Sequence, residues 1–220
     1  MDIYALASSG ETDSVLRQVH SDAHSLNACD ADGRTLLHHA ATSGNIELVA
    51  ALAELGADAD TRDGGGWSPL HSASSAGRET IVSYLLQLLS KVQIDARVEG
   101  SGSTPLIYAA SKGHAECVRL LLHASADIRE RDSNQAGALH RAAGRGHVSV
   151  LAALLAKPPH SAINDSDSRG QTAFHVAAAT GNDAACVMLA EAGADCRTTD
   201  AEGQMALELL TPSVRNQIGL

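Results

Sequence analysis

Eleven histidines are the side chains in this sequence best suited to chemistry, either as metal ligands or as general acids and bases. Four of them stand at the same place in a recurring block of six residues: His38, His71, His140 and His175. A side chain that recurs once per repeat is expected to be structural, bridging backbone groups of neighbouring segments. His20 and His24 are four residues apart, as zinc ligands on one helix face are, but no third ligand lies near them in the sequence. The histidines therefore favour structure over catalysis or metal binding.

Three other motifs match functional sites only in part. The segment 165–170 begins like a calcium loop, but Val176 stands at the twelfth position, where a carboxylate is needed. The glycines at 64–66 and 100–102 lack the lysine of a phosphate-binding loop. There is no Gly-x-Ser-x-Gly segment to present a nucleophilic serine. We therefore expect no active site, no cofactor and no metal, and a protein that is not an enzyme.

The block that carries the four histidines recurs at nearly constant spacing. Its copies begin at Thr35, Ser68, Thr104, Gly137, Thr172 and Met205. The steps between these positions are 33, 36, 33, 35 and 33 residues, and the copies approximate Thr-Pro-Leu-His-x-Ala. Such a block with a period of about 33 is typical of ankyrin repeats. The longer steps place small insertions within 87–93 and around 157–160.

Residues 33–65 show how one repeat is expected to fold. Thr35 can cap a first helix, and Gly44 can end it with a positive φ angle. A second amphipathic helix is indicated by apolar residues at helical spacing: Ile46, Val49, Leu52 and Leu55. A unit of this size buries little by itself, so stacked copies must share a core. The predicted fold is an all-α ankyrin-repeat solenoid of about seven helix–turn–helix units with β-hairpin-like fingers.

The expected domain organisation is one ankyrin-repeat domain over residues 1–220. Residues 1–32 form a weak first copy, which we interpret as an N-terminal capping repeat. Residues 33–202 hold five internal repeats, and residues 203–220 form a C-terminal cap with a worn copy of the block. Charged and polar residues cover one side of the N-terminal copy, as a capping unit requires, and a short helix to about Ile218 suits a C-terminal cap.

Composition limits the partners and the compartment. A formal net charge of −10 disfavours nucleic acid, which requires a basic surface, and favours a basic partner. No run of about 18 apolar residues and no signal-peptide pattern occurs, so we expect no membrane partner. Four widely spaced cysteines suit a reducing compartment. We expect a monomer in the cytoplasm and leave entry into the nucleus open.

Residues that the repeat does not require are the binding candidates on the concave face formed by fingers and first helices. Trp67 is the only tryptophan, a residue type enriched among interface anchors, although it can instead pack on the adjacent finger. Arg34 occupies the equivalent place one repeat earlier. Further candidates on or near first helices are Tyr108, Lys112, Arg141 and Arg145. Acidic residues at the finger tips either contact a partner or form turns: Asp30, Asp32, Asp63, Glu99, Asp132, Asp167 and Asp200.

The segment 63–86, which contains Gly-Trp-Ser-Pro-Leu-His, resembles the gankyrin family of ankyrin-repeat chaperones of the proteasome regulatory particle, including its fungal members. The segments 32–35, 103–112 and 138–143 agree with the same family, as do the seven-unit layout and the length. The resemblance implies a protein that clasps the C-terminal helical domain of one proteasomal ATPase subunit during assembly and obstructs premature docking on the core particle. The contact positions it implies are Asp32, Arg34, Trp67, Arg78 and Lys112.

The sequence also departs from that family. Gly64 stands where an acidic residue is expected, and Ile107 replaces the histidine of the block. The region 174–180 lacks the Leu-x-Cys-x-Glu motif of animal members, so we predict no binding to the retinoblastoma protein. A different function stays open, in which the chain is an ankyrin adaptor or scaffold for another protein client.

Overall fold

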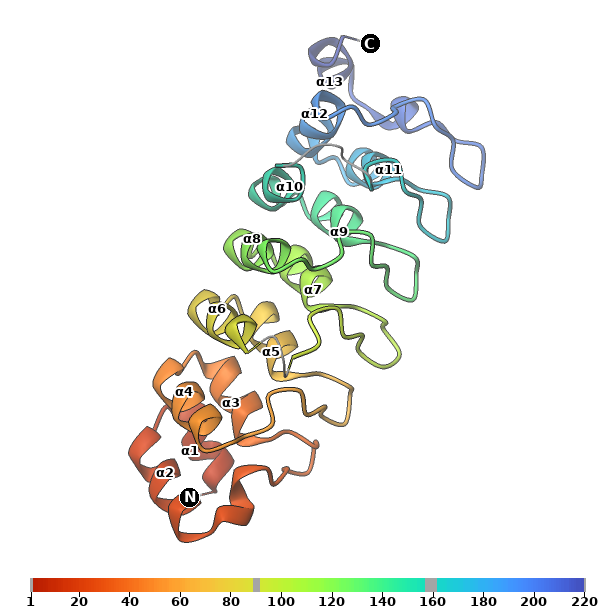
Figure 1. Ribbon diagram of the computed structural model, residues 1–220. Helices are drawn as coiled ribbons and strands as arrows, with labels where there is room; N and C mark the ends of the chain where they lie inside the picture. Colours follow the sequence, from red (N-terminus) through yellow and green to blue (C-terminus); the bar gives the residue numbers. More distant parts are fainter. Residues whose placement is uncertain (1, 89–91, 157–161, 220) are drawn as a thin grey trace. The chain divides into compact units, whose positions relative to one another are not determined.

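The computed structural model describes residues 2–88, 92–156 and 162–219. These ranges contain thirteen α-helices and no β-strand (Figure 1). The chain forms two compact units, residues 1–105 and residues 106–220. The helix–turn–helix architecture expected from the repeat is therefore confirmed. The division into two caps and five internal repeats stays a prediction.

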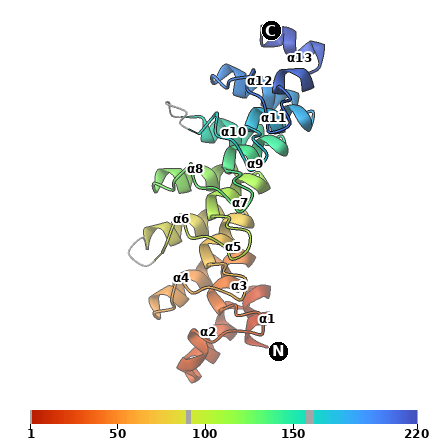
Figure 2. The same ribbon diagram turned by 90° about the vertical axis from the view of Figure 1, so that its right-hand side faces the viewer.

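The first unit contains three helical hairpins joined by extended fingers. The hairpins are α1 (Ile3–Ser9) with α2 (Thr12–Ser21), α3 (Leu36–Ser43) with α4 (Ile46–Glu54), and α5 (Pro69–Ser75) with α6 (Glu79–Gln87). A short 3₁₀ helix, η1 (Ala23–Leu26), follows α2. The first helices of successive hairpins lie side by side, α1 on α3 and α3 on α5 (Figures 1 and 2). The repeated sequence thus becomes a repeated packing arrangement.

The second unit continues the same pattern. Its hairpins are α7 (Pro105–Lys112) with α8 (Ala115–His123), α9 (Ala138–Gly144) with α10 (Val148–Leu154), and α11 (Ala173–Ala179) with α12 (Asp183–Glu191). It ends with a 3₁₀ helix, η2 (Ala206–Leu209), and α13 (Pro212–Gln217). Within this unit α9 packs on α11, and both α8 and α12 pack on α10.

The core of each hairpin is made by the residues that the repeat pattern singled out. In α3, Leu37 and Ala40 are buried, and in α4 Val49 and Leu52 are fully buried. Leu55 was expected on the same face, but this expectation is wrong. It follows the last helical residue of α4 and is 41% exposed, while Leu48 is buried in the core instead.

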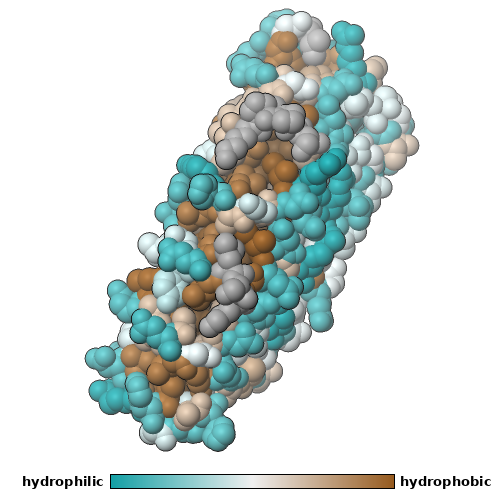
Figure 3. All heavy atoms as spheres, in the orientation of Figure 1, coloured by the Kyte–Doolittle hydropathy of each residue, from teal (hydrophilic) through white to brown (hydrophobic). Residues whose placement is uncertain are grey.

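The fingers between hairpins are extended but too short to form strands. Isolated antiparallel bridges close three of them, Cys29–Thr35, Ser166–Thr172 and Thr199–Met205. Hydrophilic residues gather over the fingers on the right-hand side of Figure 3. The first predicted insertion falls largely on residues 89–91 and the second on residues 157–160, both outside the described residues. Among those that are described, no helix combines the length and apolar character needed to cross a bilayer.

Candidate protein-binding surface

The block histidines join each first helix to the backbone around it. The Nδ1 atom of His38 accepts a hydrogen bond from the Thr35 amide at 3.1 Å, and the equivalent bonds occur at His71, His140 and His175. In this capping arrangement the histidine takes the place usually held by Glu or Gln. Because Nδ1 accepts, Nε2 carries the proton and donates it to the next finger, from His38 to the Trp67 carbonyl at 2.9 Å.

Burial maintains this neutral tautomer. It lowers the pKa of His38 and of His140, and lowers the pKa of His71 to about 4, because a charged ring would lose its hydration. With both ring nitrogens hydrogen-bonded, these three side chains have no lone pair left for a metal ion. The bridging interpretation is confirmed for His38, His71 and His140. In His175 the Nε2 atom is buried and has no hydrogen-bond partner among the described residues. The described residues include no group of three or more His, Cys, Asp or Glu side chains able to hold a metal.

Five of the seven acidic residues at the finger tips form turns, and whether any of the seven contacts a partner stays a prediction. Five of them place Oδ1 on the amides two and four residues later: Asp30, Asp63, Asp132, Asp167 and Asp200. At Asp63, for example, the bonds come from Gly65 at 2.9 Å and Trp67 at 2.8 Å. Such a loop holds the residues of the finger tip in a fixed conformation. These aspartates therefore position the tip residues.

Asp30 also joins the first finger to two helices. Its Oδ2 atom lies 2.7 Å from Nε2 of His39 on α3, and Nδ1 of His39 lies 3.0 Å from the Ser8 hydroxyl on α1. Burial alone would raise the pKa of Asp30, but hydrogen bonds from the Arg34 amide and from His39 outweigh it and lower the pKa. The carboxylate is thereby kept ionised beside Asp32 and Arg34, two of the implied contact positions.

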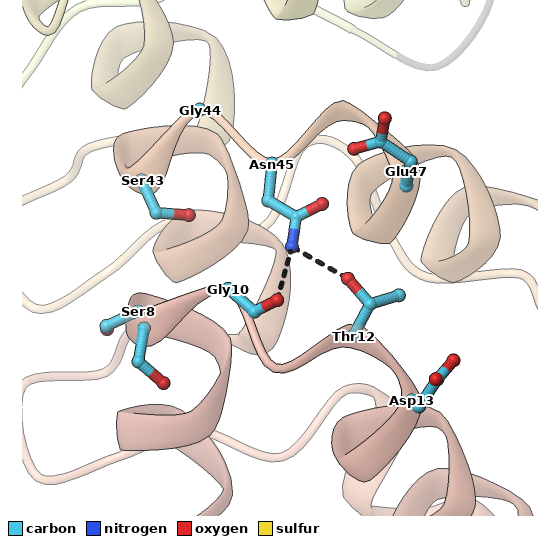
Figure 4. Close-up of a pocket in the computed structure, with 9 residues that line it drawn as sticks. Ser8, Gly10, Thr12, Asp13, Ser43, Gly44, Asn45 and Glu47 are labelled. Carbon is cyan, nitrogen blue, oxygen red and sulfur yellow. Dashed lines mark hydrogen bonds between the residues drawn. The ribbon is translucent and has the colours of Figure 1, made fainter.

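A second repeated contact joins the turns of successive hairpins. In several hairpins the residue after the turn glycine reaches the previous turn. In the first unit, Nδ2 of Asn45 donates to the Thr12 hydroxyl at 2.8 Å and to the Gly10 carbonyl at 3.4 Å (Figure 4). In the second unit, Asn182 donates to the Ala143 carbonyl at 2.9 Å. Arg78 occupies the same place, because its Nε atom donates to the Thr42 carbonyl at 3.0 Å.

Two of the implied contact cations meet at one residue of α3. While Arg78 binds the carbonyl of Thr42, Nη2 of Arg34 donates to the hydroxyl of the same residue at 2.8 Å. Arg78 is exposed, and Arg34 is half-buried. Within the described residues neither guanidinium has a carboxylate partner. The sequence alone does not identify Thr42, because nothing in a single sequence distinguishes a helix threonine that accepts hydrogen bonds from two arginines.

The other two implied positions of the first unit lie on adjacent fingers. The carbonyl of Asp32 accepts a hydrogen bond from the Gly64 amide at 2.8 Å, while the Asp32 side chain is exposed. Trp67 is half-buried against its own finger, with its ring centroid 6.0 Å from that of His71. The ring is therefore supported by its own repeat and only partly exposed. Asp32, Arg34, Trp67 and Arg78 thus lie on consecutive repeats of one unit.

Lys112, the fifth implied position, belongs to the second unit. It is the last residue of α7, is exposed, and has no carboxylate partner within the described part of the chain. Arg145 stands at the equivalent place after α9 and is also exposed. Arg141 differs, because its guanidinium forms an ion pair with the buried carboxylate of Asp132. Lys112 and Arg145 are thus exposed cations of this helix face, whereas Arg141 forms an ion pair that stabilises a finger.

Three of the four cysteines are withdrawn from the surface, while Cys29 on the first finger is exposed. All four are free thiols, and Cys117, Cys186 and Cys196 are buried. Burial raises the pKa of Cys186 to about 12, so its thiolate is scarce at neutral pH.

Comparison with known families agrees with this repeat geometry. A family model described as ankyrin repeats in three copies matches residues 3–97 and 124–200, and a single-repeat model matches residues 101–133. The chain belongs to the ankyrin-repeat family, whose members are protein-binding scaffolds. The all-α ankyrin-repeat fold predicted from the sequence is confirmed.

Individual proteins that are similar in sequence differ in how much of their own length this chain covers. The chain is 31% identical over 193 residues to the probable 26S proteasome regulatory subunit p28 of Saccharomyces cerevisiae, a match that covers 86% of this chain and 83% of the yeast protein. It is 32% identical over 182 residues to the E3 ubiquitin-protein ligase KEG of Arabidopsis thaliana, but spans only 11% of that protein. Against Neurogenic locus notch homolog protein 1 of Xenopus laevis, the identity is 36% over 129 residues, and 5% of that protein is spanned.

A solved structure shares the fold. The human ASB11 ankyrin repeat domain superposes with a TM-score of 0.84 at 24% sequence identity, over 99% of this chain and 96% of that domain.

Proposed function

We propose that this ankyrin-repeat scaffold is a non-catalytic chaperone of proteasome assembly, which binds the C-terminal helical domain of one ATPase subunit of the regulatory particle. The observation that carries the proposal is the match to the yeast proteasome subunit over most of both chains. The plant and frog matches, in contrast, cover a small part of much larger proteins. The proposed location is the cytoplasm, with entry into the nucleus open.

The proposed contacts are Asp32, Arg34, Trp67, Arg78 and Lys112. Support comes from the cations among them, none of which has a carboxylate partner within the described residues although the chain carries a net charge of −10. Arg34 and Arg78 are oriented by Thr42, which reduces the freedom that each would lose on binding. Acidic side chains of the partner would fix the register, and Trp67 would supply an apolar anchor.

Titration calorimetry with the purified C-terminal domain of each ATPase subunit tests this function. We expect one domain to bind, and the double replacement Arg34→Glu and Lys112→Glu to weaken binding at least about 100-fold, since each reversal removes a charged contact worth about 1.5–3 kcal/mol. Arg17→Glu is a control for a single charge reversal away from the contacts, because Arg17 is exposed on α2 and, within the described residues, bonds only to the Ser14 hydroxyl. Circular dichroism verifies that each variant is folded. Equal weakening by the control would refute the assignment of the contact residues.

A second candidate function is that of an adaptor for a different protein client. The similarity to the plant E3 ligase over 82% of this chain supports it. If no ATPase domain binds, while a client found by affinity purification does bind and is released by Arg34→Glu, the adaptor function replaces the chaperone function.

A further inference from the structure

The outward face of α12, in the second unit, is more apolar than the same face of the other repeats. Counting from the turn glycine, the third residue is polar in the four preceding repeats: Glu47, Thr80, Glu116 and Ser149. In α12 this residue is Ala184, which is exposed, and the two residues that follow on the same face are Val187 and Met188, both half-buried. The opposite face of α12 is already used, because Ala185 and Leu189 are fully buried in the core.

The side chains of the outward face of α12 line a surface groove of about 340 Å³ beside α13. Figure 1 shows α12 and α13 at the blue end of the chain. Ala184, Val187 and Met188 form its floor, and Gln217 of α13 lies on its rim. A helix that is apolar on opposite sides is normally covered on both of them. Within the described residues this side of α12 is covered only in part, beside α13, so the groove has the character of a docking site.

Carboxylates at the two ends of the groove determine which partner fits. Asp183 and Glu191 are exposed, lie at the first and last residues of α12, and have no cationic partner within the described part of the chain. They are eight residues apart, which corresponds to about 12 Å along the helix. Charge complementarity therefore calls for an apolar segment with a basic residue at each end.

We propose that this groove binds a basic amphipathic helix of a partner protein, with its apolar side on Val187 and Met188 and its two basic side chains on Asp183 and Glu191. A helix suits the groove because its side chains three and four residues apart lie on one face, as the floor requires. This second binding surface is separate from the five proposed ATPase contacts and does not depend on them.

The probe for this proposal is a synthetic helical peptide of about five turns with two lysines eight residues apart and leucines between them on one face. Its binding is followed by the methyl resonances of the three methionines, assigned with Met188→Leu. We expect a saturable shift of the Met188 methyl resonance alone. Val187→Lys should weaken binding at least about tenfold, whereas Ala152→Lys, at the equivalent exposed position of α10, should leave binding unchanged.

Exchanging the charges of the peptide and of the groove tests whether Asp183 and Glu191 select a basic partner. A peptide with glutamates in place of the lysines should bind at least about tenfold more weakly to the wild type, and the double variant Asp183→Lys and Glu191→Lys should restore its binding. Sedimentation velocity tests the alternative occupant, a second copy of this chain. The proposal is overturned if the Met188 resonance does not shift, if Val187→Lys and Ala152→Lys bind alike, if both peptides bind the wild type equally, or if the wild type forms a dimer that Val187→Lys abolishes.

Discussion

Ser74 should be a site where the removal of one oxygen atom stabilises the protein. It lies on α5, has no exposed surface, and its hydroxyl has no hydrogen-bond partner among the residues that the structure describes. Four of the other five copies have alanine at this position, Ala41, Ala110, Ala143 and Ala178, and the copy beginning at Met205 has Thr211. A buried polar group without a partner costs about 1–3 kcal/mol. Alanine also has a higher helix propensity than serine, by up to about 0.7 kcal/mol. Ser74→Ala should therefore raise the free energy of unfolding by about 1.5–2 kcal/mol.

Thermal and urea unfolding followed by circular dichroism measure this gain. For a chain of this length, the change corresponds to a rise in Tm of about 3–8 °C. The matched control is Ser149→Ala on α10, where the serine is exposed and only helix propensity changes. We expect the control to gain less than about 1 kcal/mol. A gain for Ser74→Ala no larger than that of the control would show that the buried hydroxyl has no desolvation cost, and would refute the reasoning.

Two other perturbations test the roles of buried groups. Burial lowers the pKa of His71 to about 4 in the folded chain, against 6.5 in the unfolded chain. Because the unfolded chain therefore binds the proton more readily, the neutral ring contributes about 3 kcal/mol to the free energy of unfolding above pH 6.5, and this contribution is lost as the pH falls towards 4. Urea titrations across this range should therefore show a weaker pH dependence for His71→Asn than for the wild type; equal dependence would contradict a buried neutral ring. Asp132→Ala removes acceptors for two amides and the partner of Arg141, and should cost about 3 kcal/mol and accelerate amide exchange in its finger. Asp32→Ala, at an exposed tip side chain, should cost less than about 0.5 kcal/mol.

The architecture could be predicted from the sequence because the same helix-capping block and the same turn glycine recur in successive repeats. The block with His38 caps a helix and reaches the next finger, and Gly44 ends that helix with φ at 91°. Where neither feature marks the end of a helix, the end of that helix is predicted less well. Leu55 fits the helical spacing of α4, but the chain turns away after Glu54 and leaves Leu55 exposed. Apolar periodicity alone does not say at which turn a helix ends.

The binding candidates were harder to interpret, because exposure and pairing depend on contacts between repeats. Arg141 and Arg145 look alike in the sequence, yet the first braces Asp132 and the second is exposed. Arg78 also lies in a structural contact that recurs at Asn45, and only the three-dimensional arrangement shows that both reach back to the preceding turn. The sequence identified the cations, and their geometry shows which of them are accessible.

The central claim is that the chain binds a proteasomal ATPase through Arg34 and Lys112. Affinity purification of the tagged chain from cells of its own source, with mass spectrometry of the bound proteins, tests it most directly. We predict that the wild type recovers one proteasomal ATPase with its neighbouring subunits, and that the variant with Arg34→Glu and Lys112→Glu does not. Recovery of an unrelated client without proteasome subunits, or equal recovery by the variant, would contradict the claim.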